Sequence, residues 1–212
     1  MRRIVMFNQV TADGYFAGPD GNLEWVVPDK EFDKSVAAGL PAAGTILFGR
    51  RTYELFEAFW PPAVGDTATA PDPHGGDRSP EIRAIGVFIN EATKLVFSRT
   101  LKSVTWRNSR VIHELDPREI EAMKREPGGD MMIFGSGSIV SQLTKHGLID
   151  EYQFFVSPVL LGNGRPLLSG VPSSSALDLL EAKQYPSGNV MLRYARSTQP
   201  TSVSTPDGGK RG

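Results

Sequence analysis

The chain has 212 residues, of which 40% are hydrophobic and 22% are charged, with a formal net charge of −1 and no cysteine. Such values are ordinary for a globular protein, and the near-zero charge argues against nucleic acid as the main partner. The lack of cysteine excludes disulfides, a thiol nucleophile and a cysteine-ligated metal. No apolar run approaches the roughly 20 residues of a membrane span, and the first residues lack a signal-peptide pattern. We therefore expect a cytoplasmic protein without a membrane segment or a metal.

In chain order, strand patterns alternate with helix patterns over most of the sequence. Apolar and β-branched runs predict strands at residues 3–10, 15–17, 45–49, 94–98, 104–106, 110–113, 131–134, 152–161, 177–185 and 190–197. Apolar residues at helical spacing predict helices at residues 30–40, 50–59, 81–90, 118–126 and 139–146. This alternation, closed by an antiparallel hairpin, predicts an α/β fold with a mixed, mostly parallel central sheet flanked by helices.

Two segments lack these patterns. Residues 61–80 are rich in Pro, Gly, Asp and Thr, which indicates an exposed loop that is either a lid or a floppy insertion. Residues 198–212 carry no apolar periodicity and are predicted to form a disordered tail. The remaining residues 1–197 are predicted to form a single domain.

The most informative stretch runs from residue 131 to residue 152. Its first four residues are apolar and predict a strand buried on both faces, and four small residues separate this strand from a helix: Gly135, Ser136, Gly137 and Ser138. A helix N-terminus presents free backbone N–H groups, which bind anions and above all phosphate. We expect Gly137 to let a pyrophosphate approach the backbone closely. The alternative is an ordinary tight turn, because a bare G-x-G lacks the third glycine of a dinucleotide fingerprint.

Five segments resemble the dihydrofolate reductase-like superfamily, and most closely its branch with the reductase domain of bacterial riboflavin synthesis (RibD C-terminal-like). They are TADGYFAGPDGNLEW (11–25), ILFGRRTYE (46–54), KLVFSRTL (94–101), IFGSGSIVSQLTKHGLIDEY (133–152) and SPVLLGNGRPLL (157–168). The resemblance implies a dihydrofolate reductase-like domain over residues 1–197, often found as a homodimer. It also implies an NADPH-dependent reductase of a small heterocyclic or carbonyl substrate, similar to the 5-amino-6-(5-phosphoribosylamino)uracil reductase. Dihydrofolate reductase activity and a non-catalytic nucleotide-binding protein are the alternatives.

The resemblance implies a cofactor site built from three turns. The first turn holds the NADPH pyrophosphate at Gly135, Ser136, Gly137 and Ser138. The second is a helix start that holds the phosphates from the other side, at Gly49, Arg50, Arg51 and Thr52. The third meets the adenosine 2′-phosphate, at Ser98, Arg99 and Thr100. Helix N-termini and arginines suit the negative charge of NADPH. The alternative is that Arg50 and Arg51 are solvated residues of the helix surface.

The substrate end departs from the dihydrofolate reductases, in which an acidic residue follows a Trp-x-x-Pro-x motif. Alignment on Trp25 and Pro28 places Lys30 at that position. The flanking acids Asp29 and Glu31 are the candidate proton donors, with ordered water as the alternative. Asp13 is a third catalytic candidate, although an Asp before Gly also stabilises turns. Three aromatic residues are the predicted substrate contacts: Tyr15, Trp25 and Tyr53. The cysteine-free chain lacks the zinc deaminase to which the riboflavin enzyme is commonly fused.

Overall fold

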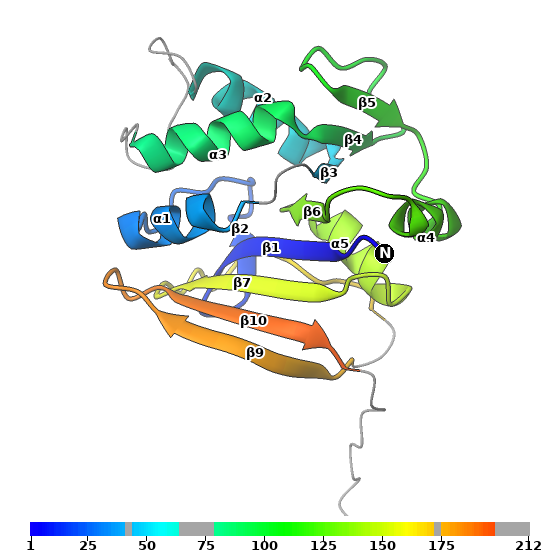
Figure 1. The fold of residues 1–212 in the computed structure, drawn as a ribbon. Coiled ribbons are helices and arrows are strands. Elements are labelled where there is room, and N and C mark those ends of the chain that lie inside the picture. Colours follow the sequence, from blue (N-terminus) through cyan, green and yellow to red (C-terminus); the bar gives the residue numbers. More distant parts are fainter. Residues whose placement is uncertain (41–43, 64–78, 172–174, 198–212) are drawn as a thin grey trace, which may run out of the picture.

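The computed structural model describes residues 1–40, 44–63, 79–171 and 175–197, which fold around a central sheet with helices on both faces (Figure 1). The helices are α1 (Lys30–Ala38), α2 (Arg50–Ala63), α3 (Pro80–Glu91), α4 (Pro117–Arg125) and α5 (Gly137–Lys145). The strands are β1 (Ile4–Thr11), β2 (Tyr15–Ala17), β3 (Thr45–Gly49), β4 (Thr93–Phe97), β5 (Ser109–Ile112), β6 (Met131–Phe134), β7 (Glu151–Ser157), β8 (Arg165–Pro166), β9 (Leu177–Gln184) and β10 (Val190–Arg196). The predicted tail and most of the predicted loop at 61–80 lie outside the described residues.

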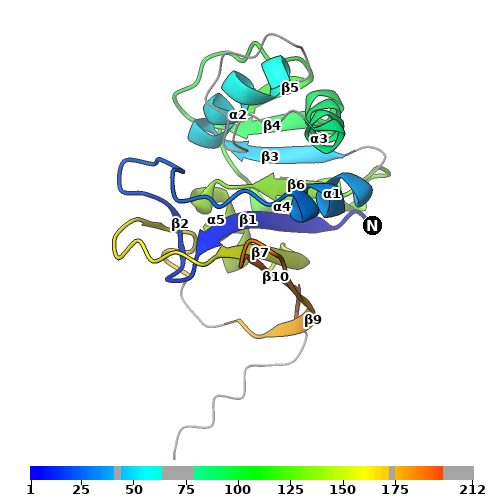
Figure 2. The ribbon, with the colours of Figure 1, turned by 90° about the vertical axis from the view of Figure 1, so that its left-hand side faces the viewer.

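The main sheet has the strand order β5-β4-β3-β6-β1-β7-β10-β9 (Figure 2). All neighbouring pairs from β5 to β7 are parallel, and β10 runs antiparallel to both β7 and β9. The predicted fold class is therefore confirmed, with a mixed, mostly parallel sheet and a C-terminal antiparallel hairpin. A second, two-stranded antiparallel sheet pairs β2 with β8.

Local sequence signals explain where several helices begin. The side chains of Asp29, Ser79 and Asp116 each accept a hydrogen bond from a backbone N–H in the first turn of α1, α3 and α4. Proline occupies the first turn of α3 and of α4, where its missing N–H costs nothing. These caps satisfy donors that a helix N-terminus would otherwise leave unpaired.

The two faces of the sheet carry different helices. α4 and α5 pack on one face, where their buried residues join Met6, Leu47 and Ile133 in one core cluster. α2 and α3, with part of α1, pack on the other face around Phe48 and Val96. Full burial of one Leu, Ile, Phe, Val or Met side chain stabilises the fold by about 1.5–3 kcal/mol.

The strand order of the parallel part of the sheet reverses at β6. β6 returns between β3 and β1 after the chain has moved outward through β3, β4 and β5. Since these strands are parallel, the carboxyl ends of β3, β4 and β6 lie side by side, with Gly49 opposite Phe97. Open α/β sheets bind ligands at such a reversal of strand order.

Three predicted strands differ in the structure. The strand at 131–134 is buried on one face only, because Met132 and Phe134 are half-buried on the other. Residues 104–106 form no strand, since the Trp106 N–H and indole nitrogen donate to the Tyr53 hydroxyl and to Asn90 instead. β7 ends at Ser157, immediately before Pro158, which cannot donate to a strand ladder.

Candidate active site

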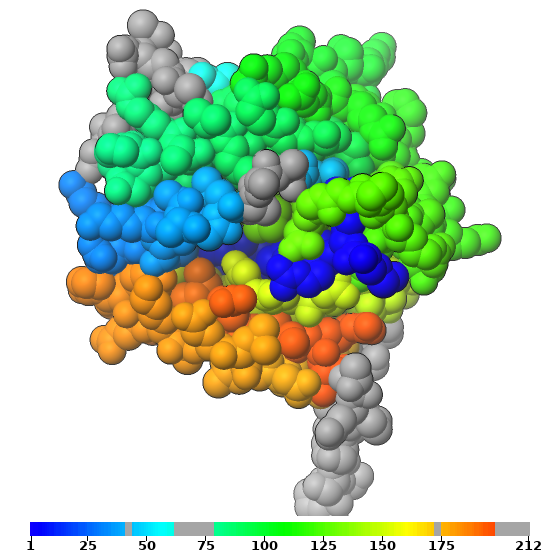
Figure 3. All heavy atoms as spheres, in the orientation of Figure 1, coloured from blue at the N-terminus to red at the C-terminus, as the bar shows by residue number. Residues whose placement is uncertain are grey.

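A cleft of about 1360 Å³ runs from the carboxyl edge of the parallel strands along the sheet face beside α1. The surface in Figure 3 is indented between α1 and the C-terminal hairpin, where this cleft opens. Ten of the eleven residues predicted to bind the cofactor line the cleft, and these are Gly49, Arg50, Arg51, Thr52, Ser98, Thr100, Gly135, Ser136, Gly137 and Ser138. Arg99 is not among the lining residues.

The starts of α2 and α5 are held together by the Ser136 side chain. Its hydroxyl accepts the Gly49 N–H at 2.7 Å and donates to Thr52 Oγ1 at 2.8 Å. The backbone of Gly135 and Ser136 is left-handed, with φ of 61° and 63°. A side chain at Gly135 would be strained and would meet Thr52 at 3.1 Å. The Ser136 hydroxyl therefore joins the starts of α2 and α5. An anion at this turn would be bound by backbone N–H groups and not by this hydroxyl.

The electrostatics of the two helix starts favour an anion. The first turn of α2 and that of α5 contain no acidic residue. The positive ends of the two helix dipoles are therefore not offset locally, and their first N–H groups lack intrahelical partners. Arg50 and Arg51 add two cations to the start of α2, and Arg50 also lies 3.7 Å from Glu54 in an exposed ion pair.

The turn after β4 is tied to the start of α2. Arg50 Nη1 donates to Thr100 Oγ1 at 3.2 Å, and the Ser98 hydroxyl accepts the N–H groups of Thr100 and Leu101. Because Arg99 does not line the cleft, Arg50 is the cation joined to this turn. The predicted three turns therefore meet, but with a different arginine at the third turn.

Gly137 lines the cleft with its backbone, but a side chain at this position would point at protein. A Cβ atom at this position would lie 2.9 Å from the Leu167 carbonyl oxygen and 3.1 Å from the Phe16 ring. Its lack of a side chain therefore allows α5 to approach the segment around β8. The expectation that Gly137 serves the close approach of a pyrophosphate lacks support in this geometry.

The middle of the cleft has an aromatic wall, which we define as Phe7, Phe32, Phe56 and Phe134. All four side chains line the cleft. Phe7 stacks on Phe32 with ring centroids 5.6 Å apart and meets the edge of Phe134 at 6.1 Å. Phe134 in turn stacks on Phe56 at 5.9 Å. The wall thus runs continuously from α1 across β1 and β6 to α2.

The three predicted catalytic acids lie outside the cleft lining. Asp29 caps α1 and also accepts the Ser187 N–H at 3.1 Å, which ties α1 to the β9–β10 turn. Asp13 accepts the N–H groups of Leu161 and Gly162, and Glu31 forms an exposed ion pair with Lys34. Each carboxylate therefore has a structural partner.

Replacing Asp29 by alanine should lower the free energy of unfolding by about 2 kcal/mol, because a helix cap and a second hydrogen bond are lost. Burial raises the pKa of Asp29, but hydrogen bonds from Ser187 and Phe32 outweigh it and hold the pKa below its ordinary value. A carboxylate with a lowered folded-state pKa stabilises the fold above the unfolded pKa of about 4, and this stability is lost as the pH falls through the folded pKa. Urea unfolding at several pH values should therefore show parent and variant converging below about pH 4.

Glu31→Ala is the matched control for this prediction, since its exposed ion pair should contribute less than about 1 kcal/mol. A variant at Asp29 that keeps parental stability and loses turnover would contradict the structural role and restore a role in chemistry.

The three predicted substrate contacts are also absent from the cleft lining. Tyr53 is 1% exposed, and its hydroxyl donates to Glu57 Oε1 at 2.7 Å and accepts the Trp106 N–H. Trp25 is buried, and its indole nitrogen has no acceptor among the residues that the structure describes. Tyr15 is the first residue of β2, and its side chain packs against Gly164, just before β8.

Other residues that line the cleft were not predicted as site residues. Asp33 lies one turn beyond Asp29 on α1 and is a buried carboxylate in the cleft wall. Asn8 on β1 is also buried there, and its side-chain oxygen has no donor within the described parts of the chain. The aromatic wall was missed because its rings come from four separate elements.

Residues 2–191 match the family model of the RibD C-terminal domain. The chain belongs to the RibD C-terminal domain family. Two family relatives in Bacillus subtilis (strain 168) are the uncharacterized proteins YyaP and YwjB. YyaP is 28% identical to this chain, and the match covers 91% of this chain and 94% of YyaP. YwjB is 26% identical, and its match covers 92% of this chain and 99% of YwjB.

Solved structures share the fold of this RibD C-terminal domain. A structure described as a riboflavin biosynthesis protein, from Shewanella sp. PV-4, has a TM-score of 0.65 at 19% identity, over 92% of this chain and 99% of that chain. A deaminase/5-amino-6-(5-phosphoribosylamino)uracil reductase from Thermotoga maritima has a TM-score of 0.58 at 15% identity, over 92% of this chain and 57% of that chain. These structures confirm the dihydrofolate reductase-like fold that the five sequence segments implied.

Two features are absent from the described residues. No helix there is long and apolar enough to cross a membrane. No group of three or more His, Cys, Asp or Glu residues in these ranges is placed to hold a metal ion.

Proposed function

We propose that this protein is an NADPH-dependent oxidoreductase that reduces a small heterocyclic or carbonyl substrate. The observation that carries the proposal is the meeting of two acid-free helix starts with the turn after β4, at one end of a cleft with an aromatic wall. Membership of the RibD C-terminal domain family, which includes reductases, supports the same chemistry.

The residues present fit a dinucleotide phosphate. The N–H groups at the starts of α2 and α5 would hold the pyrophosphate, and Arg50 and Arg51 would supply positive charge. Ser98, Thr100 and Arg50 would meet the 2′-phosphate. The bound cofactor supplies a hydride, while the protein orients the substrate and excludes water.

A reduction by hydride also needs a proton, and Asp33 is the better placed acid. Asp33 lies in the cleft wall on α1, whereas Asp29 and Glu31 point to structural partners outside it. We therefore transfer the proposed proton-donating role from Asp29 to Asp33, with ordered water as the alternative donor.

Binding of NADPH is the direct test. NADPH at about 100 times its dissociation constant should stabilise the protein by roughly 2.7 kcal/mol, which a melting curve detects as a shift of several degrees. NADH at the same concentration should give a smaller shift, and FMN none. A protein that FMN stabilises more than NADPH would overturn the proposal. Binding of NADPH without its oxidation by any compound of a carbonyl and heterocycle panel would favour the non-catalytic alternative.

We also propose a homodimer formed through the C-terminal hairpin. The sheet face of β7, β10 and β9 that is turned away from α1 carries four half-buried apolar residues, with Leu179, 58% exposed, beside them: Phe154, Leu192, Tyr194 and Leu177. In Figure 2 the hairpin extends beyond the helices. Apolar side chains that gather on one accessible face are typical of interaction surfaces.

Light scattering should give twice the monomer mass at micromolar concentration. Leu179→Lys should shift the protein toward the monomer, because it places a charge in the apolar face. Leu160→Lys is the control, since Leu160 is exposed in the loop after β7 and outside this face. A monomeric parent protein would contradict the dimer.

A further inference from the structure

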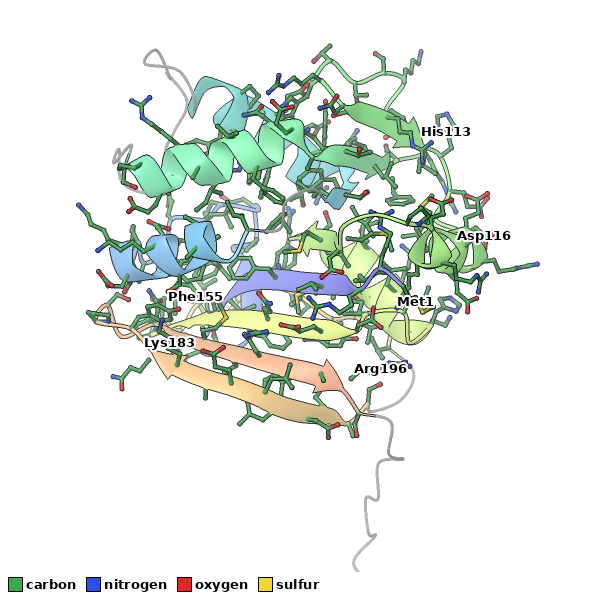
Figure 4. The ribbon with its side chains drawn as sticks, viewed as in Figure 1. Met1, His113, Asp116, Phe155, Lys183 and Arg196 are labelled. Carbon is green, nitrogen blue, oxygen red and sulfur yellow. The ribbon has the colours of Figure 1, made fainter. Side chains whose placement is uncertain are left out.

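The two sides of the cleft, across the sheet from β1, differ in the side chains that line them. On the hairpin side, the lining residues of β7, β9 and β10 are mostly charged or polar, and Figure 4 shows one of them, Lys183, on β9. These residues are Glu151, Gln153, Glu181, Lys183, Met191 and Arg193. On the other side, the lining residues of β6, of α3 and of α2 beyond its first turn are all apolar.

The apolar side includes a pocket lined by α2 and α3. Six apolar side chains form it, and we call them the apolar pocket: Leu55, Phe56, Phe59, Trp60, Ile85 and Ile89. Residues four apart share a helix face, so each of the two helices turns one apolar face toward the cleft. Val36 of α1 also lines the cleft and packs against the core cluster to which these side chains belong.

The apolar pocket is continuous with the aromatic wall. Phe134 of the wall stacks on Phe56 with ring centroids 5.9 Å apart, and the Phe56 ring lies 6.2 Å from the Trp60 ring. Phe56 therefore belongs to both. A ligand that lies against the wall can extend into the pocket over apolar surface alone.

The pocket reaches into the core of the protein. Phe59, Trp60, Ile85 and Ile89 are buried, whereas Leu55 is 49% exposed and marks the opening. The surface of a second protein could not contact side chains placed so deeply, but a small molecule can. The whole cleft of about 1360 Å³ also exceeds the roughly 300–1,000 Å³ of a pocket for one drug-sized ligand, so it has room for a substrate beside a cofactor.

From this arrangement we infer that the substrate carries an apolar group of the size of a ring, which binds in the apolar pocket next to the aromatic wall. Such a lining favours burial of apolar surface, whereas a charged group would lose its hydration there without a partner. The other end of the substrate is free to carry charge, because Arg50, Arg51 and Arg165 also line the cleft. The inference rests on the proposed function for the word substrate, but the pocket itself does not depend on the cofactor.

The experiment compares two uncharged alcohols on the full-length protein without cofactor, using isothermal titration. 2-Naphthylmethanol has two fused rings, and benzyl alcohol has one. 2-Naphthylmethanol should bind with a dissociation constant below about 1 mM, and benzyl alcohol should bind about tenfold more weakly, because the second ring buries further apolar surface. No binding of 2-naphthylmethanol at that concentration would overturn the inference, and so would a difference of less than about threefold between the two alcohols.

Variants test whether the ring lies in the apolar pocket. Leu55→Glu places a charge at its opening and should weaken the binding of 2-naphthylmethanol by roughly tenfold. Val87→Glu is the matched control, since Val87 is 47% exposed on α3 and does not line the cleft. Both positions are about half exposed, so both variants should keep the parental melting temperature within about 2 °C. Equal losses of binding in the two variants, or none in Leu55→Glu, would overturn the inference.

A titration in the presence of NADPH distinguishes this inference from the proposed function. Saturating NADPH should change the dissociation constant of 2-naphthylmethanol by less than about threefold, because the pocket and the helix starts are lined by different residues. Competition between the two ligands would assign the pocket to the cofactor and overturn the inference. Binding of 2-naphthylmethanol that depends on Leu55, in a protein that fails to bind NADPH, would contradict the reductase and leave the apolar pocket standing. NADPH binding without binding of 2-naphthylmethanol would do the reverse.

Discussion

Arg50→Ala should weaken NADPH binding by roughly tenfold to a hundredfold, and NADH binding by much less, because a charge-assisted hydrogen bond contributes about 1.5–3 kcal/mol. Arg50 is the arginine that bonds Thr100 in the turn after β4, where the family resemblance places the adenosine 2′-phosphate. Its guanidinium is planar and can bond two phosphate oxygens at once. Its other contact, an exposed ion pair with Glu54, is too weak to compete strongly with a phosphate.

Arg99→Ala is the matched control for this prediction. Arg99 precedes Thr100 in the same turn, is exposed and does not line the cleft, so its removal should leave both dissociation constants unchanged within about twofold. Fluorescence titration with NADPH and with NADH gives the dissociation constants of the parent and both variants, and each variant is compared with the parent for each cofactor. A larger loss in Arg99→Ala than in Arg50→Ala would restore the assignment that sequence reasoning favoured.

The architecture was predictable because its signals are local. Asp116 followed by Pro117 marks the start of α4, and the run of four apolar residues before Gly135 marks β6. The junctions after β3 and β6 were also recognisable as candidate anion sites, because each leads from a strand through glycine into a helix. The two junctions touch because β3 and β6 are parallel neighbours in the sheet, so their carboxyl ends lie side by side.

The roles of single side chains were less predictable, since they depend on how an element is rotated about its axis. Asp29 and Asp33 lie one turn apart on α1, and the sequence pattern alone does not decide which carboxylate enters the cleft. The Ser187 N–H that holds Asp29 comes from 158 residues away. The sequence left open for a similar reason which arginine meets the turn after β4, because only the register of β3 with β4 brings Arg50 to this turn.

The aromatic wall and the ion pairs of Glu151 with Arg3 and Arg193 could not be predicted from the sequence. Phe7 and Phe32 stack because α1 crosses the face of β1, and Glu151 joins Arg3 to Arg193 because β7 lies beside β1 and β10. In sequence these are isolated aromatic and charged residues without a motif. Only the packing of elements that are distant in the sequence brings these residues together, so the sequence could not show their arrangement.

Gly137→Val should lower the free energy of unfolding by about 3 kcal/mol or more, and the melting temperature by roughly 6–12 °C. A Cβ at this position would lie 2.9 Å from the Leu167 carbonyl oxygen, closer than packed atoms tolerate, and the second neighbour is the Phe16 ring at 3.1 Å. A backbone carbonyl cannot turn away as a flexible side chain can, so either α5 or the segment after β8 must shift. Overpacking of a tight contact costs about 1–3 kcal/mol, and the branched side chain of valine adds to it.

Ser138→Ala, at the next and exposed position of α5, is the control and should change stability by less than about 0.5 kcal/mol. Thermal and urea unfolding of the three proteins would measure these differences before any cofactor titration. The order matters, because loss of NADPH binding in a Gly137 variant would otherwise be read as a blocked phosphate. A Gly137→Val protein with parental stability and no NADPH binding would show that this position faces the ligand, as the small-residue turn first indicated. Loss of stability would show instead that Gly137 lets α5 pack against the segment that follows β8.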